Sequence, residues 1–373
     1  MARSSGKGSW RVRDVCGVLS GIAPPALAAE WDNVGLLVGR EAAPVRSLVL
    51  TIDLTEAVLR EAVGARAEMV MAYHPPIFKP ILRLTASSSP VAYAAARSGL
   101  ALYSMHTALD AAEGGTNDAL AGAMGMVDLR PLTESKGPGE CKIVVFVPAG
   151  GLSAVAAAAF AAGAGRIGNY SECSFRTGGA GTFRGGAGSR PAVGRAGRRE
   201  EVQELRLELV APRAAVAEVV RAIRKVHRYE TPAIDVYPLE GLPGPSGMGR
   251  IGSLRPAVSF QTLLRRVRRL SPSGRVLVAG PRPGRVRTVA CCAGSCGDAF
   301  RSAVSAGAQV YVTGEMRHHD ALAAASAGLT VVCVGHSNSE RPVLLPLAAR
   351  IRRELPGLKV LISRQDRDPF EII

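Results

Sequence analysis

The sequence has few of the features that would assign it to a membrane or secreted class. No run of apolar residues reaches the roughly 18 that a membrane-spanning helix needs, and the Ala-rich stretch 152–164 is too short. The seven cysteines are an odd number and include no Cys-x-x-Cys pair, so we expect reduced thiols rather than a disulfide framework. The basic residues before Asp14 are not followed by an apolar segment, which argues against a secretory signal and leaves a short organellar leader open. We expect a cytoplasmic protein without a membrane segment.

Acidic residues are missing from two arginine-rich segments. The chain carries 46 basic and 31 acidic residues, and its segments 176–199 and 265–287 contain many arginines and no acid. Such segments could bind a polyanion. Lysine is scarce beside arginine, however, and Ala and Gly are abundant, which is a bias typical of coding composition. Nucleic acid is therefore the less favoured partner.

Patterns of buried strands and of helices alternate in the first third of the chain. The expected elements are strands at 45–52, 68–73 and 101–105, and helices at 54–63 and 91–97. This order is typical of a parallel or mixed sheet covered by helices. The hydrophobic content of 47% is enough for a sizeable core. The sequence therefore predicts an α/β fold.

Composition changes twice along the chain and divides it into three parts. We predict an N-terminal α/β half at 1–134, an inserted domain at 135–245 with an Arg/Gly-rich mobile loop at 177–197, and a C-terminal α/β half at 246–373. The two halves resemble each other, because 62–72 aligns with 303–313. The prediction is two related α/β halves, with mixed sheets and covering helices, interrupted by a middle domain.

Three histidines, His74, His106 and His336, lie at the ends of expected strands. A carboxylate follows two of them four residues later, Asp110 after His106 and Glu340 after His336. Open α/β sheets bind ligands at the carboxyl ends of strands, and zinc, iron and manganese all accept imidazole and carboxylate ligands. If the halves face each other, His74, Asp110, His336 and Glu340 converge on a metal, with His106 close by. The alternative is that each histidine only satisfies a buried hydrogen bond.

No motif for a protein nucleophile or a phosphate-binding loop accompanies these histidines. Gly294–Gly297 lacks the spacing of a Gly-x-Ser-x-Gly elbow, and 177–197 lacks the Lys-Ser/Thr ending of a phosphate loop. A metal-activated water is therefore the expected nucleophile. Glu315 and His106 are the candidate catalytic residues, as acid, base or partner of a ligand. For Glu315 the alternative is an acid that only favours a helix start.

Several motifs spread over nearly the whole chain match one known family. They are Glu30-Trp31-Asp32-Asn33-Val34-Gly35, Tyr73-His74-Pro75-Pro76-Ile77-Phe78, His106-Thr107-Ala108-Leu109-Asp110, Gly314-Glu315 with His318-His319-Asp320, and Gly335-His336-Ser337-Asn338-Ser339-Glu340-Arg341. Together they resemble the NIF-three-like family (NGG-one interacting factor three-like), also named GTP cyclohydrolase one type two. The motifs that contain Tyr73 and His336 look like those of the eukaryotic branch of the family. The middle part of the chain is similar to the insert of longer bacterial members.

The resemblance implies two divalent metals in a cavity between the α/β halves, a ferredoxin-like insert and a toroidal homohexamer. It carries over His74, Asp110, His336 and Glu340 as ligands, with Glu340 bridging the two metals and His106 beside them. The bacterial pattern has two adjacent histidines where this chain has Tyr73 and His74. One or two ions of zinc, iron or manganese are therefore expected per chain.

The resemblance also implies an activity, a divalent-metal-dependent hydrolase acting on a nucleotide or related phosphorylated compound. In the cyclohydrolase version, water attacks C8 of the guanine ring of GTP and formate leaves. The alternative is a non-catalytic metal-binding scaffold that binds protein partners or nucleic acid. A steep salt dependence of binding would favour the scaffold, whereas turnover lost in His336→Ala would favour the enzyme.

Overall fold

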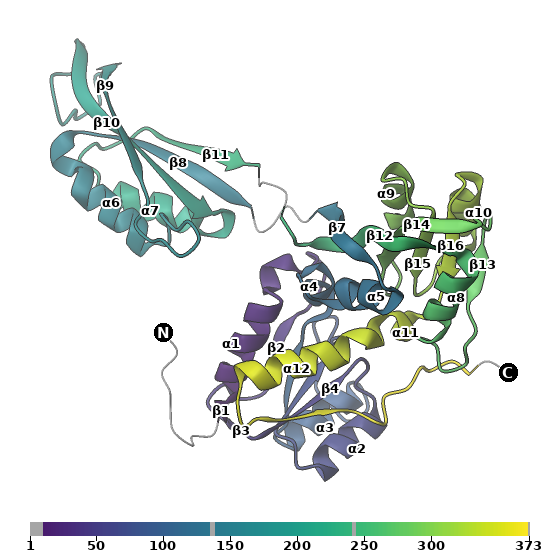
Figure 1. Cartoon of the computed structure of the whole chain (residues 1–373). Coiled ribbons are helices and arrows are strands. Elements are labelled where there is room, and N and C mark those ends of the chain that lie inside the picture. Colours follow the sequence, from purple (N-terminus) through teal and green to yellow (C-terminus); the bar gives the residue numbers. More distant parts are fainter. Residues whose placement is uncertain (1–9, 135–138, 241–243, 372–373) are drawn as a thin grey trace. The chain divides into compact units, whose positions relative to one another are not determined.

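A computed structural model describes residues 10–134, 139–240 and 244–371, and the chain forms two compact units (Figure 1). Unit 1 combines Met1–Ser135 with Gly244–Ile373, and unit 2 is Lys136–Pro243. The two ends of the chain thus build one body, and the middle part builds the other. The finer division of unit 1 into two related halves stays a prediction. In the described part of the chain, no helix has both the length and the apolar character needed to cross a membrane.

The first sheet of unit 1 has five strands in the order β17-β4-β5-β6-β2. These strands are β2 (Gly35–Val38), β4 (Ser47–Thr51), β5 (Met69–Ala72), β6 (Ala101–Ser104) and β17 (Lys359–Ile362). All neighbours are parallel except β2 and β6. Every residue of β4, β5 and β6 is buried, as expected for parallel strands covered on both faces.

Helices cover both faces of this sheet, and side chains alternate between them. The helices are α1 (Val12–Ile22), α2 (Glu56–Gly64), α3 (Pro90–Arg97) and α12 (Leu344–Glu354). Leu48, Leu50 and Met71 join the core that contains residues of α1 and α12, whereas Val49 and Val70 join residues of α2 and α3. The expected order of strands and helices in this region is confirmed, with small shifts at the ends of elements.

The second sheet of unit 1 has six strands in the order β13-β16-β15-β14-β12-β7. These strands are β7 (Val127–Glu134), β12 (Gly247–Ser259), β13 (Leu277–Ala279), β14 (Arg285–Cys292), β15 (Val310–Thr313) and β16 (Thr330–Cys333). The three strands β14, β15 and β16 are parallel, and the other pairs are antiparallel. The accompanying helices are α5 (Thr116–Met124), α8 (Phe260–Arg268), α9 (Ala299–Ser305) and α10 (His318–Ser326). The predicted mixed α/β class is confirmed.

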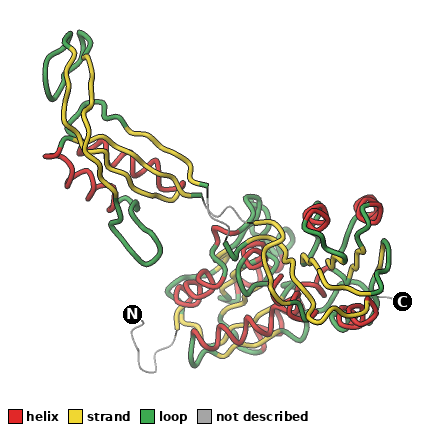
Figure 2. Tube along the Cα trace, turned by 45° about the horizontal axis from the view of Figure 1, so that its top comes forward, coloured by secondary structure: helices red, strands yellow, loops and turns green. Residues whose placement is uncertain are grey.

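Unit 2 contains a four-stranded antiparallel sheet in the order β11-β8-β10-β9. In Figure 2 its strands are yellow and its two helices red. Its elements are β8 (Glu140–Val147), α6 (Leu152–Ala161), β9 (Phe175–Arg184), β10 (Arg199–Pro212), α7 (Val216–Val226) and β11 (Ile234–Leu239). Both helices share a core with β8 and β10. The predicted loop at 177–197 is wrong in its first part, because 177–184 belong to β9 and pair with β10. Gly-rich sequence fits there because ladder hydrogen bonds need only backbone groups.

Candidate metal centre

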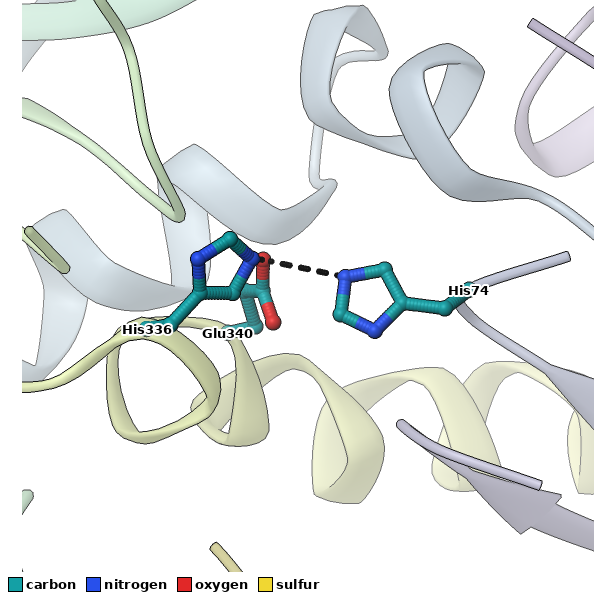
Figure 3. Close-up of side chains that lie close together, drawn as sticks. All are labelled: His74, His336 and Glu340. Atoms are coloured by element: carbon teal, nitrogen blue, oxygen red, sulfur yellow. Dashed lines mark ion pairs between the residues drawn. The ribbon is translucent and has the colours of Figure 1, made fainter. Parts of the chain in front are cut away.

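His74, His336 and Glu340 come together in unit 1, from segments far apart in the sequence (Figure 3). His74 directly follows Tyr73 at the end of β5, and β5 is a strand of the first sheet. His336 and Glu340 begin and end the short helix α11 (His336–Glu340), which follows β16 of the second sheet. One ligand atom from each residue lies within 4.8 Å of the other two. The three residues therefore follow the carboxyl ends of β5 and β16, which are parallel strands of two different sheets. Open sheets bind ligands at these ends.

Glu340 lies between the two imidazoles. Its Oε1 is 3.5 Å from His74 Nε2 and 3.2 Å from His336 Nε2. Its side chain is buried, and its Oε2 has no hydrogen-bond partner among the described residues. A buried carboxylate oxygen without a partner costs free energy, and a cation would satisfy it. Two imidazole nitrogens and one carboxylate are a donor set suited to zinc, iron or manganese.

Each imidazole also contacts a second carboxylate through its other ring nitrogen, Nδ1. His74 Nδ1 is 2.8 Å from Asp53 Oδ1, and His336 Nδ1 is 3.0 Å from Glu315 Oε1. Hydrogen bonds of this kind fix the ring orientation and leave Nε2 as the ligand atom. Sequence reasoning named Glu315 but missed Asp53. Asp53 lies just after the buried strand β4, and β4 is the neighbour of β5, the strand that precedes His74. This position at a strand end was the signal in the sequence that could have identified Asp53.

Proton affinities in the group are strongly shifted. Burial lowers the pKa of His74, but hydrogen bonds with Asp53 and Glu340 outweigh it and raise that pKa to about 10. The hydrogen bond with Glu340 outweighs burial for His336 too and raises its pKa to about 9. Burial alone would raise the pKa of Glu340, yet the two histidines lower it. The metal-free centre therefore holds protons that a bound cation would replace.

Asp110 lies beside this group and is bound to Tyr73. Tyr73 Oη donates a hydrogen bond of 2.5 Å to Asp110 Oδ1, and both side chains are buried. Burial raises the pKa of Asp110 to about 6, with a contribution from the Glu340 carboxylate. Asp110 is not part of the group of three. Its predicted role as a metal ligand stays a prediction, and Tyr73 competes for the same oxygen.

His106 begins α4 (His106–Ala111) next to His74, with ring centroids 5.3 Å apart. Its Nδ1 is 2.8 Å from Asp32 Oδ1, which in turn accepts a hydrogen bond from the backbone N of Asn33. The backbone of His106 has a φ of 24°, a strained value for a residue with a side chain. Strain of this kind is kept where the surroundings hold a residue in place, and it accumulates at functional sites.

The turn after β14 packs directly against the group. Gly294 N donates to Ser339 Oγ at 2.8 Å, and Gly294 has a φ of 71°. A Cβ at Gly294 would lie 2.8 Å from Glu340 Oε1 and 3.5 Å from His336 Nε2. Only glycine leaves this space open, and sequence reasoning, which considered Gly294 only for a nucleophile elbow, did not identify this role.

A disulfide between Cys292 and Cys296 spans the same turn. The expectation that all seven cysteines are reduced is therefore wrong for this pair. The turn between β14 and α9 brings the two Cα atoms to 6.0 Å, inside the range that a disulfide requires. Spacing in the sequence did not reveal this proximity, because the separation of four residues matches no standard redox or zinc motif.

Comparisons with known proteins agree with the motifs of the site. The family model Duf34/NIF3 (NGG1p interacting factor 3) matches residues 10–369. The chain is 34% identical over 357 residues to a GTP cyclohydrolase 1 type 2 homolog of Halalkalibacterium halodurans, covering 94% of this chain and 96% of that protein. It is 32% identical over 391 residues to NIF3-like protein 1 of Bos taurus, covering 99% of this chain and 94% of that protein.

Solved structures share the fold of this chain. A Bacillus cereus protein related to NIF3 matches with a TM-score of 0.70 and 31% identity, over 98% of this chain and all of that one. The Staphylococcus aureus protein SA1388 matches with a TM-score of 0.77 and 23% identity, over 99% of this chain and 100% of that one. Sequence motifs, family model and curated relatives agree, and the chain belongs to the Duf34/NIF3 family.

Proposed function

We propose that this protein is a divalent-metal-dependent hydrolase acting on a nucleotide or a related phosphorylated compound. The observation that carries the proposal is the group His74, His336 and Glu340, with a buried carboxylate oxygen that lacks a partner. The relatives named GTP cyclohydrolase 1 type 2 homolog support a nucleotide as the substrate class. The cyclohydrolase reaction itself is one version of the proposal, with GTP as its substrate.

His74, His336 and Glu340 would hold the cation, and zinc, iron or manganese there would supply a Lewis acid that lowers the pKa of water. Asp53 and Glu315 keep the two imidazoles in their ligating orientation through Nδ1. Asp110 would serve a second ion once Tyr73 releases its oxygen. We therefore propose one firmly held ion per chain, and a second one only after that hydrogen bond opens.

Glu315 and His106 are the proposed proton carriers. The side chain of Glu315 is 55% exposed, so a substrate can reach the carboxylate, which would accept a proton from the attacking water. Asp32 holds Nδ1 of His106, so Nε2 is the atom that would give a proton to a leaving group. A carboxylate that orients an imidazole in this way is the usual support of a general acid or base.

The finer architecture belongs to the same proposal. The antiparallel sheet and two helices of unit 2 support a ferredoxin-like insert. We also propose a metal cavity between two related halves and, from the resemblance, a cytoplasmic homohexamer. Sedimentation of the full chain would test the assembly, because one chain has a mass of 38.9 kDa.

Turnover and metal binding can be separated by experiment. Protein purified without chelator is assayed with a nucleotide panel, and both phosphate and formate are measured. Glu315→Gln and His106→Ala should keep the metal and lose on the order of a hundredfold in rate, the usual contribution of a positioned acid or base. Metal bound at full occupancy with no turnover of any nucleotide would contradict the hydrolase and favour the scaffold.

A further inference from the structure

Two exposed aromatic rings lie next to the candidate metal centre. Trp31 is 62% exposed and Phe78 is 44% exposed, and their ring centroids are 5.9 Å apart. Both also contact His106, with centroid distances of 6.0 Å from Trp31 and 6.5 Å from Phe78. Adjacent exposed aromatic rings beside a polar site are a sign of ligand binding.

Partly buried hydrogen bonds hold the segments that carry these rings. Asp32, which follows Trp31, accepts hydrogen bonds from the backbone N and Oγ1 of Thr107 and contacts His106 Nδ1. Asn33 Nδ2 donates to the carbonyl of Ile77 at 2.6 Å and so ties the turn of Trp31 to the segment that carries Phe78. The rings of Trp31 and Phe78 are thus ordered before any ligand arrives, which lowers the entropy cost of binding.

The same rings lead to the centre. His106 is 5.3 Å from His74, and His74 is 5.5 Å from His336, measured between ring centroids. A row of rings therefore runs from exposed Trp31 to the ligand atoms around Glu340. The outer end offers flat apolar faces, and the inner end is the candidate metal centre, where a bound cation would attract an anion. A nucleotide has the same polarity, with a flat base at one end and anionic phosphate at the other.

We infer that Trp31 and Phe78 form a stacking platform for the base of a nucleotide, which places its phosphate, rather than its base, at the His74–His336–Glu340 centre. This inference rests on the proposed hydrolase function and specifies its reaction as phosphoester hydrolysis. The oxygen of water forms a bond to phosphorus, and its proton passes to Glu315. The bond from phosphorus to the ester oxygen breaks, and that oxygen keeps the electron pair and takes a proton from His106. The products are a nucleoside and inorganic phosphate when the substrate is a nucleoside monophosphate.

Trp31 itself reports on occupancy of the platform. The chain has two tryptophans, and Trp10→Phe leaves Trp31 as the sole indole emitter. In this variant of the full chain, GMP should quench Trp31 emission, whereas ribose 5-phosphate, which lacks a base, should not. Phe78→Ala in the same background should weaken GMP binding on the order of tenfold. Tyr170→Ala, which removes a ring that is 76% exposed in unit 2, should leave it unchanged.

Equal quenching by GMP and ribose 5-phosphate would overturn the platform, as would unchanged GMP binding in a folded Phe78→Ala variant. The orientation has a separate readout, because GMP should release phosphate and no formate. Release of formate would overturn the orientation and leave the hydrolase intact. Quenching by GMP, with no turnover of any nucleotide in the panel, would support the platform and contradict the proposed function, so the two failures are distinguishable.

Discussion

At the scale of single residues, Glu340 defines the candidate centre. It is buried, its Oε1 faces two imidazoles and its Oε2 lacks a partner among the described residues. His336 and Glu340 are separated by four residues, as are His106 and Asp110, yet only the former pair joins the group. Asp110 instead accepts a hydrogen bond from Tyr73, and His106 contacts Asp32. The repeated spacing in the sequence therefore identified both pairs. It could not show that one of the two carboxylates, Asp110, accepts a hydrogen bond from another side chain.

Stability of the metal-free protein should depend on pH through this group. The pKa values of His74 and His336 are raised in the folded protein to about 10 and about 9. Their contribution to the free energy of unfolding is therefore fully present below the unfolded pKa of about 6.5, and it is lost as the pH rises through 9 to 10. Glu340 has a lowered pKa, so its contribution is lost only in acid, as pH falls through that value. Urea unfolding of chelator-treated protein should thus show stability falling between about pH 7 and 10. Glu340→Gln should flatten that decline, and an equally steep decline in this variant would refute the assignment.

Tyr73 should matter for stability through Asp110. Tyr73→Phe removes the donor and leaves a buried carboxyl group without its partner, which should lower the free energy of unfolding by about 1–3 kcal/mol. Tyr103→Phe is a matched control, because Tyr103 Oη bonds only the hydroxyl of Ser20, which is less buried. The control should lose less, about 1 kcal/mol. Denaturant titrations of both variants at neutral pH measure the difference, and equal losses would contradict the role given to Asp110.

At the scale of elements, the strands that end at the site were predictable and several contacts across the fold were not. Buried runs followed by a histidine correctly located the ends of β5 and β16. The roles of Asp53 and Gly294 were missed, because strand order alone brings their partners to them: β4 lies beside β5 in the first sheet, and β14 and β16 belong to the same second sheet. Local periodicity carries no information about which strand ends become neighbours.

Gly294 gives a direct test of how the turn after β14 shapes the centre. Gly294→Ala places a Cβ 2.8 Å from Glu340 Oε1, so metal affinity should fall at least tenfold. Gly274→Ala is the control, because Gly274 has a similar φ of 64° and open space around the added atom. Both variants pay the same backbone strain. Metal titration of the chelated proteins compares them, and equal affinities would show that the turn does not shape the centre.

At the scale of the whole molecule, the candidate centre belongs entirely to unit 1. The chain leaves unit 1 after β7 and returns in β12, and these strands pair, with Glu134 opposite Gly247. Unit 2 therefore begins and ends at neighbouring points of one antiparallel pair. The sequence predicted an inserted segment from its change in composition, but strand pairing explains how unit 1 can close without it.

Excision of unit 2 should leave the centre intact. Replacing 136–243 by a short Gly/Ser linker turns β7 and β12 into a simple hairpin, because their ends already pair. The shortened protein should keep its metal content and a cooperative unfolding transition. Circular dichroism and elemental analysis check both, and loss of metal in a folded product would show that unit 2 contributes to the site.

Metal content per chain tests the central claim most directly. Elemental mass spectrometry is applied to protein purified without chelator, to His336→Ala/Glu340→Ala, and to the control His227→Ala in unit 2. The account predicts about one divalent ion per chain in the wild type and the control, approaching two where the second position fills, and almost none in the double variant. Equal metal in the double variant, or none in the wild type, would contradict a metal centre at His74, His336 and Glu340.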